Sequence, residues 1–388
     1  DASFTQRLLA SVDDFDEQCN GVILNSENFQ ALGFLQRKWS RLIDMTYIDP
    51  PYNTENDNFI YKDSYKHSTW LSMISNRLRR VCKLTSDSSF LSISIDDHEM
   101  ASLRTLLDKE LAAGSFDTQI RIQSNKRGQT YQDIAKTHEY LLFYGLGAES
   151  KANQLPREDG SGDGQDEQGV YELWGLRNRN PKFGRHNRPN LFYPIYVAPE
   201  SSEDGLAPVS LERSDKFHHK VLPRNSKGDD SCWRWGTDKL SKELRQNGRL
   251  AVVAKQKRDG EWKVCQKARL KTKKAKSIWF DVSMISERGT TELGKLGLSE
   301  DFDFPKPPAL IQKAITIGAP EDGLVLDFFA GSGTTGQAVI SLNREEDANR
   351  KYILVEMGQY CDTVLKPRIQ KVVYSKDWED GKPKSQDT

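Results

Sequence analysis

The chain has 388 residues, with 56 basic and 56 acidic side chains and a formal net charge of zero. A single hydrophobic core rarely fills so long a chain, so we expect a large α/β core with an inserted or appended module. A neutral chain carries no overall attraction to a polyanion, and any nucleic-acid surface must come from local segregation of charge.

The five cysteines are scattered without a CxxC pair. This spacing disfavours a zinc site, an iron–sulfur cluster or a disulfide framework, and it fits a reducing cytoplasmic compartment. No apolar run approaches the ~20 residues of a membrane span, and the N-terminus lacks a secretory pattern. Because the first residue is Asp1 rather than Met, we expect the chain to be part of a longer protein.

Short apolar runs alternate with helical patterns at both ends of the chain, which predicts a doubly wound, mostly parallel mixed sheet of the Rossmann-like kind. In chain order, the expected strands are 42–48, 90–95, 119–123, 140–144, 324–327 and 352–356. The expected helices are 70–84, 99–111, 308–317 and 336–342. Between about 147 and 288 the sequence becomes polar and rich in turns. We therefore expect an insertion between two halves of one core.

The strand at 42–48 would deliver the tetrapeptide Asp49-Pro50-Pro51-Tyr52 at its carboxyl end. An exocyclic amine on a base is a poor nucleophile because the ring delocalises its lone pair. The Asp49 carboxylate and the Pro50 carbonyl can accept both N–H groups and free that lone pair, while the prolines keep these acceptors aimed. The Tyr52 ring offers a stacking surface worth about 1–3 kcal/mol per flipped base. The alternative is a proline turn with a buried tyrosine.

A second motif follows the strand at 324–327 and turns through two glycines into a helix. It lacks the third glycine of a dinucleotide fingerprint and the lysine of a P-loop, which disfavours pyrophosphate and triphosphate ligands. The next strand ends at Glu356, where a carboxylate can accept hydrogen bonds from ribose hydroxyls. The alternatives are a tight turn without a ligand and a solvated carboxylate. The predicted cofactor-binding residues are Asp327, Phe329, Ala330, Gly331, Ser332, Gly333, Thr334 and Glu356.

These motifs resemble those of S-adenosylmethionine-dependent DNA amino-methyltransferases, whose cofactor motif reads D-x-F-x-G-x-G. The catalytic tetrapeptide precedes the cofactor turn here, which is the order of the β subclass. Flanking segments resemble the modification (Mod) subunits of type III restriction–modification systems over about residues 20–375. They lie at 47–54, 67–71, 93–97, 137–140, 188–191, 233–236 and 276–279.

The resemblance implies methyl transfer to a flipped base of double-stranded DNA, without a metal. In that family Asp at the position of Asp49 usually accompanies adenine N6, Ser accompanies cytosine N4, and Asn occurs in further adenine and protein-glutamine enzymes. Adenine N6 is therefore favoured, with a cytosine-N4 enzyme or a catalytically idle DNA-specificity subunit as alternatives. Segment 302–307 matches the region that lines the methionine end of the cofactor. Lys306 would offset the cofactor's carboxylate there, unless it is a surface lysine.

The resemblance also implies a division into a catalytic half at 1–146, a target-recognition domain at 147–288 and a cofactor half at 289–375. Residues 376–388 would form a tail that leads into a further C-terminal region. A homodimer in the bacterial cytoplasm is expected, and a restriction subunit with helicase and nuclease activity is a further candidate partner.

Basic side chains of the insertion are the candidates for phosphate and base-edge contacts, interleaved with Phe183 and Asn187. The alternative is that these basic side chains only form a solvated face of the protein. His67 and His138 are expected to be packing residues, and Trp70 and Trp279 core residues. The predicted DNA contacts are Arg177, Arg179, Lys182, Arg185, Arg188, Lys271, Lys273 and Lys274.

Overall fold

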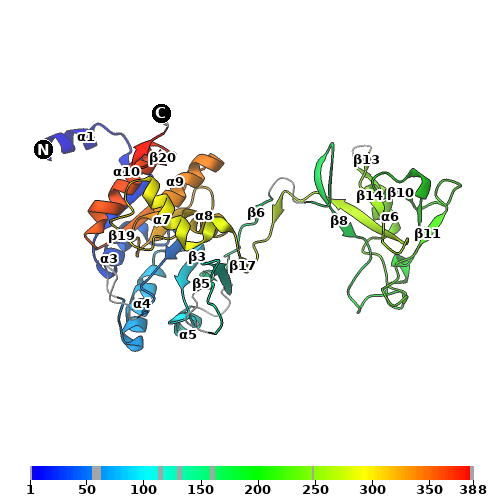
Figure 1. Ribbon diagram of the computed structural model, residues 1–388, viewed down its shortest axis with the longest axis horizontal. Helices are drawn as coiled ribbons and strands as arrows, with labels where there is room; N and C mark the ends of the chain where they lie inside the picture. Colours follow the sequence, from blue (N-terminus) through cyan, green and yellow to red (C-terminus); the bar gives the residue numbers. More distant parts are fainter. Residues whose placement is uncertain are drawn as a thin grey trace. The chain divides into compact units, whose positions relative to one another are not determined.

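The computed structural model describes residues 2–54, 63–111, 117–128, 133–157, 162–246 and 249–384. The chain divides into two compact units, unit 1 with residues 1–155 and 274–388 and unit 2 with residues 156–273 (Figure 1). Unit 2 spans fewer residues than the insertion predicted at 147–288. The flanking Ala152 and Ala275 pack against the core of unit 1, and strand β17 (Ile278–Trp279) joins its sheet.

Unit 1 is built on an eight-stranded sheet in the order β1-β19-β18-β2-β3-β5-β4-β17. Strand β5 is antiparallel to β3 and β4, and the other neighbouring pairs are parallel. The predicted α/β class with a mixed, mostly parallel sheet is confirmed. The strands are β1 (Gly21–Asn25), β2 (Ile43–Ile48), β3 (Thr85–Ile95), β4 (Asp117–Gln123), β5 (His138–Gly145), β18 (Leu324–Asp327) and β19 (Lys351–Glu356).

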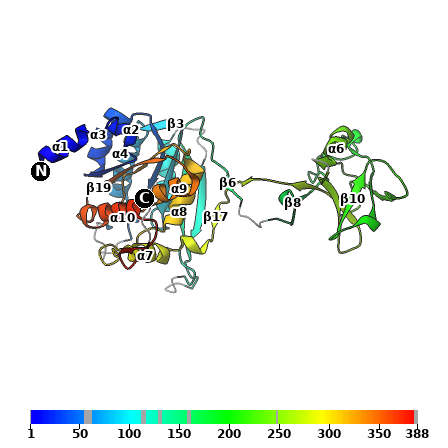
Figure 2. The ribbon, with the colours of Figure 1, turned by 90° about the horizontal axis from the view of Figure 1, so that it is seen from above.

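Helices bury both faces of this sheet, and the layers can be followed in Figure 2. Neighbouring residues of one strand, such as Leu141 and Leu142, therefore belong to two different apolar clusters. One layer contains α3 (Asn28–Trp39), α4 (His67–Val81) and α5 (Met100–Glu110). The other contains α8 (Pro308–Gly318), α9 (Thr334–Glu346) and α10 (Lys366–Tyr374), with α10 preceded by the π-helical turn η4 (Cys361–Leu365).

Every element expected from apolar periodicity is present, with ends that differ by a few residues. In α4 the buried residues are Trp70, Ile74, Leu78 and Val81, whereas Leu71, which has the same helical spacing in the sequence, is half-buried. Both Trp70 and Trp279 are core residues as predicted. Strand β1 was not predicted, because its five residues are short and only partly buried. Among the described residues, no helix combines the length and apolar character needed to cross a bilayer.

Part of the predicted tail packs on unit 1. Residues 378–383 form the hairpin β20 (Trp378–Glu379) and β21 (Lys382–Pro383), and the Gly381 N–H donates to the Lys295 carbonyl of α7 (Ser286–Lys295) at 2.9 Å. Trp378 packs against the apolar cluster beneath α7, which explains why this segment holds to unit 1. Residues 385–388 of the tail lie outside the described residues.

Unit 2 is centred on a seven-stranded antiparallel sheet in the order β11-β9-β10-β14-β15-β8-β7. Its own apolar cluster includes Leu176, Val197, Trp233, Val252 and Val264. The strands are β7 (Gly164–Asp166), β8 (Gly169–Gly175), β9 (Ile195–Val197), β10 (Leu206–Ser210), β11 (His219–Val221), β14 (Val252–Gln256) and β15 (Trp262–Ala268).

The remaining elements of the two units are short. They are α1 (Ala2–Ala10), α2 (Phe15–Gln18), β6 (Leu155–Pro156), η1 (Pro189–Leu191), η2 (Pro199–Ser201), α6 (Thr237–Glu243), β12 (Arg245–Gln246), β13 (Arg249–Leu250), β16 (Thr272–Lys273) and η3 (Val282–Met284).

Helix α7 packs directly on the backbone that leads to Lys306, and this contact requires glycine at position 289. A Cβ at Gly289 would lie 1.8 Å from the Pro305 carbonyl oxygen. We expect Gly289→Ala to destabilise the protein by about 1–3 kcal/mol, because the clash involves backbone that must shift. Thermal unfolding followed by circular dichroism measures this effect.

Gly294→Ala in the same helix is the matched control, since a Cβ there would meet only the Ser299 side chain at 3.6 Å. Alanine should be neutral at that position, or stabilising by up to about 1 kcal/mol through its helix propensity. A Gly289→Ala variant as stable as the Gly294→Ala variant would contradict the packing described here.

Candidate active site

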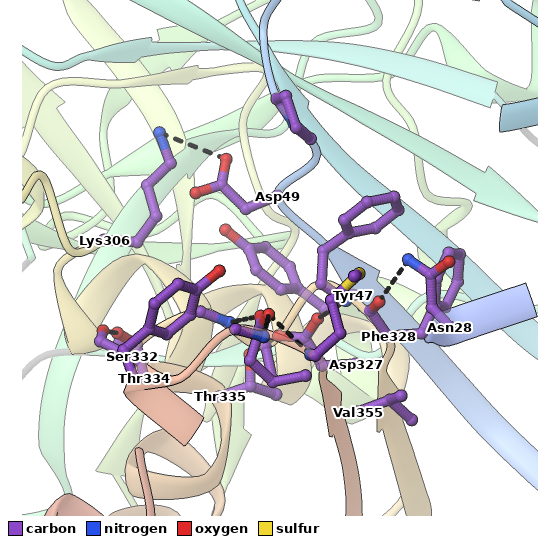
Figure 3. A pocket seen from close by; sticks show the side chains of 18 of the residues that line it. Asn28, Tyr47, Asp49, Lys306, Asp327, Phe328, Ser332, Thr334, Thr335 and Val355 are labelled. Carbon is purple, nitrogen blue, oxygen red and sulfur yellow. Dashed lines mark hydrogen bonds and ion pairs between the residues drawn. The ribbon is translucent and has the colours of Figure 1, made fainter. Parts of the chain in front are cut away.

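A cavity of about 380 Å³ opens where β1, β2, β18 and β19 end, a size typical of small-molecule sites. The carboxyl ends of parallel strands meet at one edge of a sheet, so segments far apart in sequence converge there. Asp49 after β2 and residues 327–332 after β18 both line the cavity (Figure 3). The two motifs singled out in the sequence therefore share one site.

The turn after β18 is held by the side chain of Asp327. Its carboxylate accepts hydrogen bonds from the Phe329 N–H at 3.0 Å and from the Thr335 hydroxyl at 2.5 Å. Burial raises the pKa of Asp327 to about 7. Gly331 and Gly333 adopt φ values of 53° and 84°, a left-handed region in which any side chain is strained. The backbone can therefore form the wall of the cavity.

Glu356 at the end of β19 also lines the cavity and is only 8% exposed. One carboxylate oxygen accepts from the Gly331 N–H at 2.9 Å, and the other accepts from the N–H groups of Met357 and Gly358 at 2.8 and 2.9 Å. Glu356 is thus no solvated strand-end carboxylate. A carboxylate has about four acceptor positions, so these three bonds leave capacity for a hydroxyl of a ligand.

Asp49 carries a buried oxygen, Oδ1, without a hydrogen-bond partner among the described residues. The nearest cation is Lys306, whose Nζ lies 3.5 Å from this oxygen. Burial raises the pKa of Asp49 to about 6, although the Lys306 charge opposes this shift and Glu139 adds to it. An acceptor that is buried and unpaired costs free energy, and a donor from a ligand would remove that cost.

Lys306 is bound on the Asp49 side of the cavity. Its Nζ donates to the Tyr52 hydroxyl at 2.6 Å and to Glu139 at 2.8 Å, and the Tyr52 hydroxyl donates to the same Glu139 oxygen at 3.0 Å. Burial by itself would lower the pKa of Lys306, but the charges of Asp49 and Glu139 raise it above its ordinary value. Lys306 lines the cavity, and its pairing with the cofactor's carboxylate stays a prediction.

Glu139 was missed by the sequence analysis, although it lies in the quoted segment 137–140. The available signal was a carboxylate at the start of an otherwise apolar strand, where it is buried. Pro51 lines the cavity, whereas Pro50 and Tyr52 lie outside its lining. The stacking role of the Tyr52 ring stays a prediction, because its hydroxyl is tied to Lys306 and Glu139.

The tetrapeptide is anchored on both sides. The buried Trp70 indole donates to the Pro51 carbonyl at 2.8 Å. The side chain of Asn53, a residue with φ of 62°, donates to Glu99 at 2.7 Å and accepts from the Tyr65 N–H at 2.6 Å. These bonds fix the orientation of the loop that carries Asp49.

Two histidines left without a catalytic role are in packing or hydrogen-bonding contacts. His67 lies 2.6 Å from Glu99, and the His138 ring packs edge-on against Tyr140. Among the described residues, no group of three or more His, Cys, Asp or Glu side chains is arranged to hold a metal ion.

The segment after β1 also lines the cavity and was not selected from the sequence. Asn28 donates to the Phe328 carbonyl at 3.0 Å (Figure 3) and accepts from Arg77 at 2.7 Å. The signal was a polar Ser-Glu-Asn sequence directly after a short apolar run, which is recognisable only once β1 is known to join the sheet.

The residues predicted to contact DNA differ in how far their side chains are exposed to solvent. Arg179 and Lys182 are exposed in the loop after β8, and Arg188 is exposed with its guanidinium 5.2 Å from the Phe183 ring centre. Lys271 and Lys274 are exposed and Lys273 is half-buried. These residues remain predictions.

Three other polar residues of the same loop are engaged within the unit. The Arg185 guanidinium binds Asp230 at 3.1 Å, and the half-buried Arg177 donates to a backbone carbonyl. Asn187 donates to the Lys182 carbonyl and accepts from the Gly184 N–H, so its amide builds the loop. They are weaker candidates for base contacts than the sequence indicated.

The segment 255–276 is rich in lysine and arginine, and part of its charge is bound within unit 2. Lys267 and Arg269 both bind Asp166, at 2.9 and 2.7 Å. Burial alone would raise the pKa of Asp166, but these two cations lower it to about 2. This pair therefore holds β15 to β7, and its charge is compensated inside unit 2.

The fold and the site define an α/β protein with a glycine-rich turn next to a buried carboxylate, in one cavity at the carboxyl ends of its strands. The family model for DNA methylase matches residues 43–366. The type II methyltransferase M.KpnI of Klebsiella pneumoniae is 32% identical over 367 residues, which cover 91% of this chain and 84% of that protein. The EcoPI Mod subunit of Escherichia phage P1 is 28% identical over 388 residues, covering 89% of this chain and 58% of that protein.

A solved structure, the cytosine-N4-specific PvuII DNA methyltransferase, matches with a TM-score of 0.45 and 11% identity, covering 91% of this chain and 90% of that one. The chain belongs to the DNA methylase family. The resemblance to DNA amino-methyltransferases and Mod subunits is confirmed, and the chain spans about half of the length of the Mod relatives.

The cofactor of this DNA methyltransferase is S-adenosylmethionine. The residues present fit this group: the glycine turn admits a ligand close to the backbone, Glu356 retains acceptor capacity, and the cavity volume suits a nucleoside.

Proposed function

We propose that this protein methylates N6 of a flipped-out adenine at a specific site in duplex DNA, as part of a restriction–modification or related defence system. The observation that carries the proposal is the buried Oδ1 of Asp49, which accepts no hydrogen bond from the described residues and lies in the same cavity as the glycine turn. The proposed catalytic segment is Asp49 to Tyr52, and the proposed cofactor site is formed by residues 327–334 and Glu356.

Near the amine, the protein must accept hydrogen bonds from the N–H groups and take up a proton. Asp49 accepts one N–H and the Pro50 carbonyl accepts the other, so that the nitrogen lone pair is turned away from the ring. S-adenosylmethionine supplies an electrophilic methyl group when it is bound. The amine loses one proton as it gains the methyl group, and Asp49, with its pKa near 6, is a stronger base than an ordinary aspartate.

Adenine is favoured over cytosine because the residue at position 49 is Asp rather than Ser. The same pair of acceptors would serve the N4 amine of cytosine, so this alternative differs in the shape of the base and not in the chemistry. A catalytically idle specificity subunit is disfavoured, because it would have no use for a buried carboxylate with an acceptor oxygen left without a hydrogen bond beside a cofactor turn.

Further parts of the proposal concern partners. Unit 2, at 156–273, is the target-recognition domain, and its exposed cations contact phosphates. The protein acts as a homodimer on DNA in the bacterial cytoplasm. A restriction subunit is a candidate partner, in line with the Mod subunits among its relatives.

Replacing Asp49 by Ala should abolish methyl transfer and leave binding of S-adenosylmethionine within a few-fold of the wild type. Transfer is measured with a radiolabelled methyl group, binding by calorimetry, and the modified base by mass analysis of digested nucleosides. The matched control is Asp303→Ala, which removes an exposed carboxylate from the segment beside the cavity. Transfer that survives in Asp49→Ala would contradict the assigned role. If the product were N4-methylcytosine, the target base would be cytosine and not adenine.

Single-turnover transfer should decline as the pH falls through about 6, because protonated Asp49 is a weaker acceptor for the amine N–H and can no longer act as a base. An ordinary aspartate would give this decline near pH 4. Lys306→Met should move the acidic limb to higher pH, since the lysine charge favours ionised Asp49. The control is Lys295→Met, whose ammonium pairs with Glu292. A limb that stays in place in Lys306→Met would contradict this electrostatic coupling.

DNA affinity should fall steeply with salt, and Arg179→Ala, Lys182→Ala and Arg188→Ala should each reduce the slope of log K against log salt by about 1. Fluorescence anisotropy of labelled duplex DNA at several salt concentrations measures this slope. Arg269→Ala is the control, because this guanidinium is bound to Asp166. Affinity that does not vary with salt would overturn the phosphate contacts.

A further inference from the structure

Glu139 is a buried carboxylate that the proposed reaction does not use. It is the second residue of β5, which runs antiparallel to β3 with Tyr140 opposite Ile95. The start of β5 therefore lies at the sheet edge where β3 ends. Strand β2 is parallel to β3 and ends at this same edge, directly before Asp49. The fold thus brings a second carboxylate to the side of the site that carries Asp49.

Both carboxylates interact with one cation, the ammonium group of Lys306. Its Nζ atom lies 2.8 Å from Glu139 Oε2 and 3.5 Å from Asp49 Oδ1, and Figure 3 shows the longer of these contacts. The shorter distance is that of a charge-assisted hydrogen bond, whereas the longer one exceeds it. Lys306 is thus bound to Glu139, and Asp49 Oδ1 accepts no hydrogen bond from the described residues.

The Tyr52 hydroxyl binds the same ammonium group. An ammonium group only donates and a carboxylate only accepts, which fixes the direction of each bond. The hydroxyl oxygen accepts from Lys306 at 2.6 Å, and its O–H donates to Glu139 Oε2 at 3.0 Å. The three groups therefore form a closed triangle. Glu139 is the member that accepts from both of the others, so the triangle depends on its charge.

Loss of the Glu139 charge would change the contact between Lys306 and Asp49. A buried ammonium and a carboxylate attract each other strongly, and such pairs close to about 2.7–2.9 Å. The ammonium would have to move less than ~1 Å from its present distance of 3.5 Å to form this bond. It would then occupy the oxygen that the amine N–H needs, and the lysine of the protein itself would compete with the substrate.

We propose that Glu139 is a positioning residue, which holds the Lys306 ammonium away from Asp49 and so keeps Oδ1 free to accept an N–H of the target amine. This role rests on Asp49 being the amine acceptor of the proposed function. Glu139 is not among the residues that line the cavity, so it acts on the amine through Lys306 and not by contact.

The charges around Asp49 make this role visible in the pH dependence of transfer. The titratable groups that interact with this carboxylate are Lys306, Glu139, Tyr52, Tyr47 and Asp327. Burial raises the pKa of Asp49 to about 6, the Lys306 charge opposes this shift, and the Glu139 charge adds to it. Glu139→Gln removes a negative neighbour and lets the ammonium approach, and both changes lower the pKa of Asp49. The acidic limb of the pH–rate profile should therefore move to lower pH, even though the plateau rate falls.

The experiment measures single-turnover transfer from radiolabelled S-adenosylmethionine to genomic DNA without methylated adenine, over a range of pH. Glu139→Gln should lower the plateau rate by about tenfold and move the acidic limb down by about one pH unit. In the Lys306→Met background the same substitution should change the plateau by less than about twofold, since no ammonium remains to occupy Asp49. This double-mutant cycle isolates the action of Glu139 through Lys306.

Glu110→Gln is the matched control, because it removes a carboxylate that is also paired with a cation, Arg79 at 2.7 Å, but does not line the cavity. It should leave the plateau and the acidic limb unchanged. Equal losses from Glu139→Gln in the two backgrounds would show a merely structural role and overturn the inference, as would an acidic limb that stays in place.

If Glu139→Gln does not fold, Tyr52→Phe takes its place, because it removes the other group that holds the ammonium and keeps the ring. Its loss of transfer should again be smaller in the Lys306→Met background, and equal losses in the two backgrounds overturn the inference. A wild type that transfers no methyl group to DNA would instead refute the proposed function, and the role of Glu139 with it.

Discussion

The site depends on the parallel pairing of β2 with β18, two strands separated by almost 280 residues. Met45 pairs with Val325 and Thr46 with Leu326, so both strands end at the same edge of the sheet. This register sets Asp49 beside the glycine turn that starts at Asp327. Neither motif forms a reaction site by itself, and a slip of two residues in this pairing would separate the amine acceptor from the cofactor.

Buried charge is distributed unevenly around the cavity. On one side Asp49 and Glu139 share the single ammonium of Lys306, so the group retains a net negative charge next to the proposed amine. On the other side Arg368 lies behind the turn, and no carboxylate of the described residues pairs with it. In a low-dielectric interior such charges act over longer distances than in water, and each side favours a ligand group of opposite character. The two ends of the cavity would therefore attract ligand groups of opposite charge.

The proposed function assigns methyl transfer to unit 1 and DNA recognition to unit 2. The reaction site is built by strand ends and short turns of unit 1, which a rigid sheet holds in place. Unit 2 offers an antiparallel sheet whose loop after β8 carries exposed cations. Part of its charge is compensated internally, since Asp166 binds both Lys267 and Arg269. Counting basic residues in a sequence therefore overstates the charge that a DNA-binding surface presents.

The sequence by itself determined the class of fold, the elements of the core and the two motifs, because apolar periodicity and local turn chemistry are short-range properties. Strand β1 escaped because five partly buried residues carry little periodic signal. The tertiary structure alone decided which side chains meet. Lys306 binds Glu139 across 167 residues and also contacts Asp49, and Arg368 reaches the turn from a helix with no motif of its own. Such contacts arise from how strands and helices pack, and packing depends on long-range complementarity that no local pattern encodes.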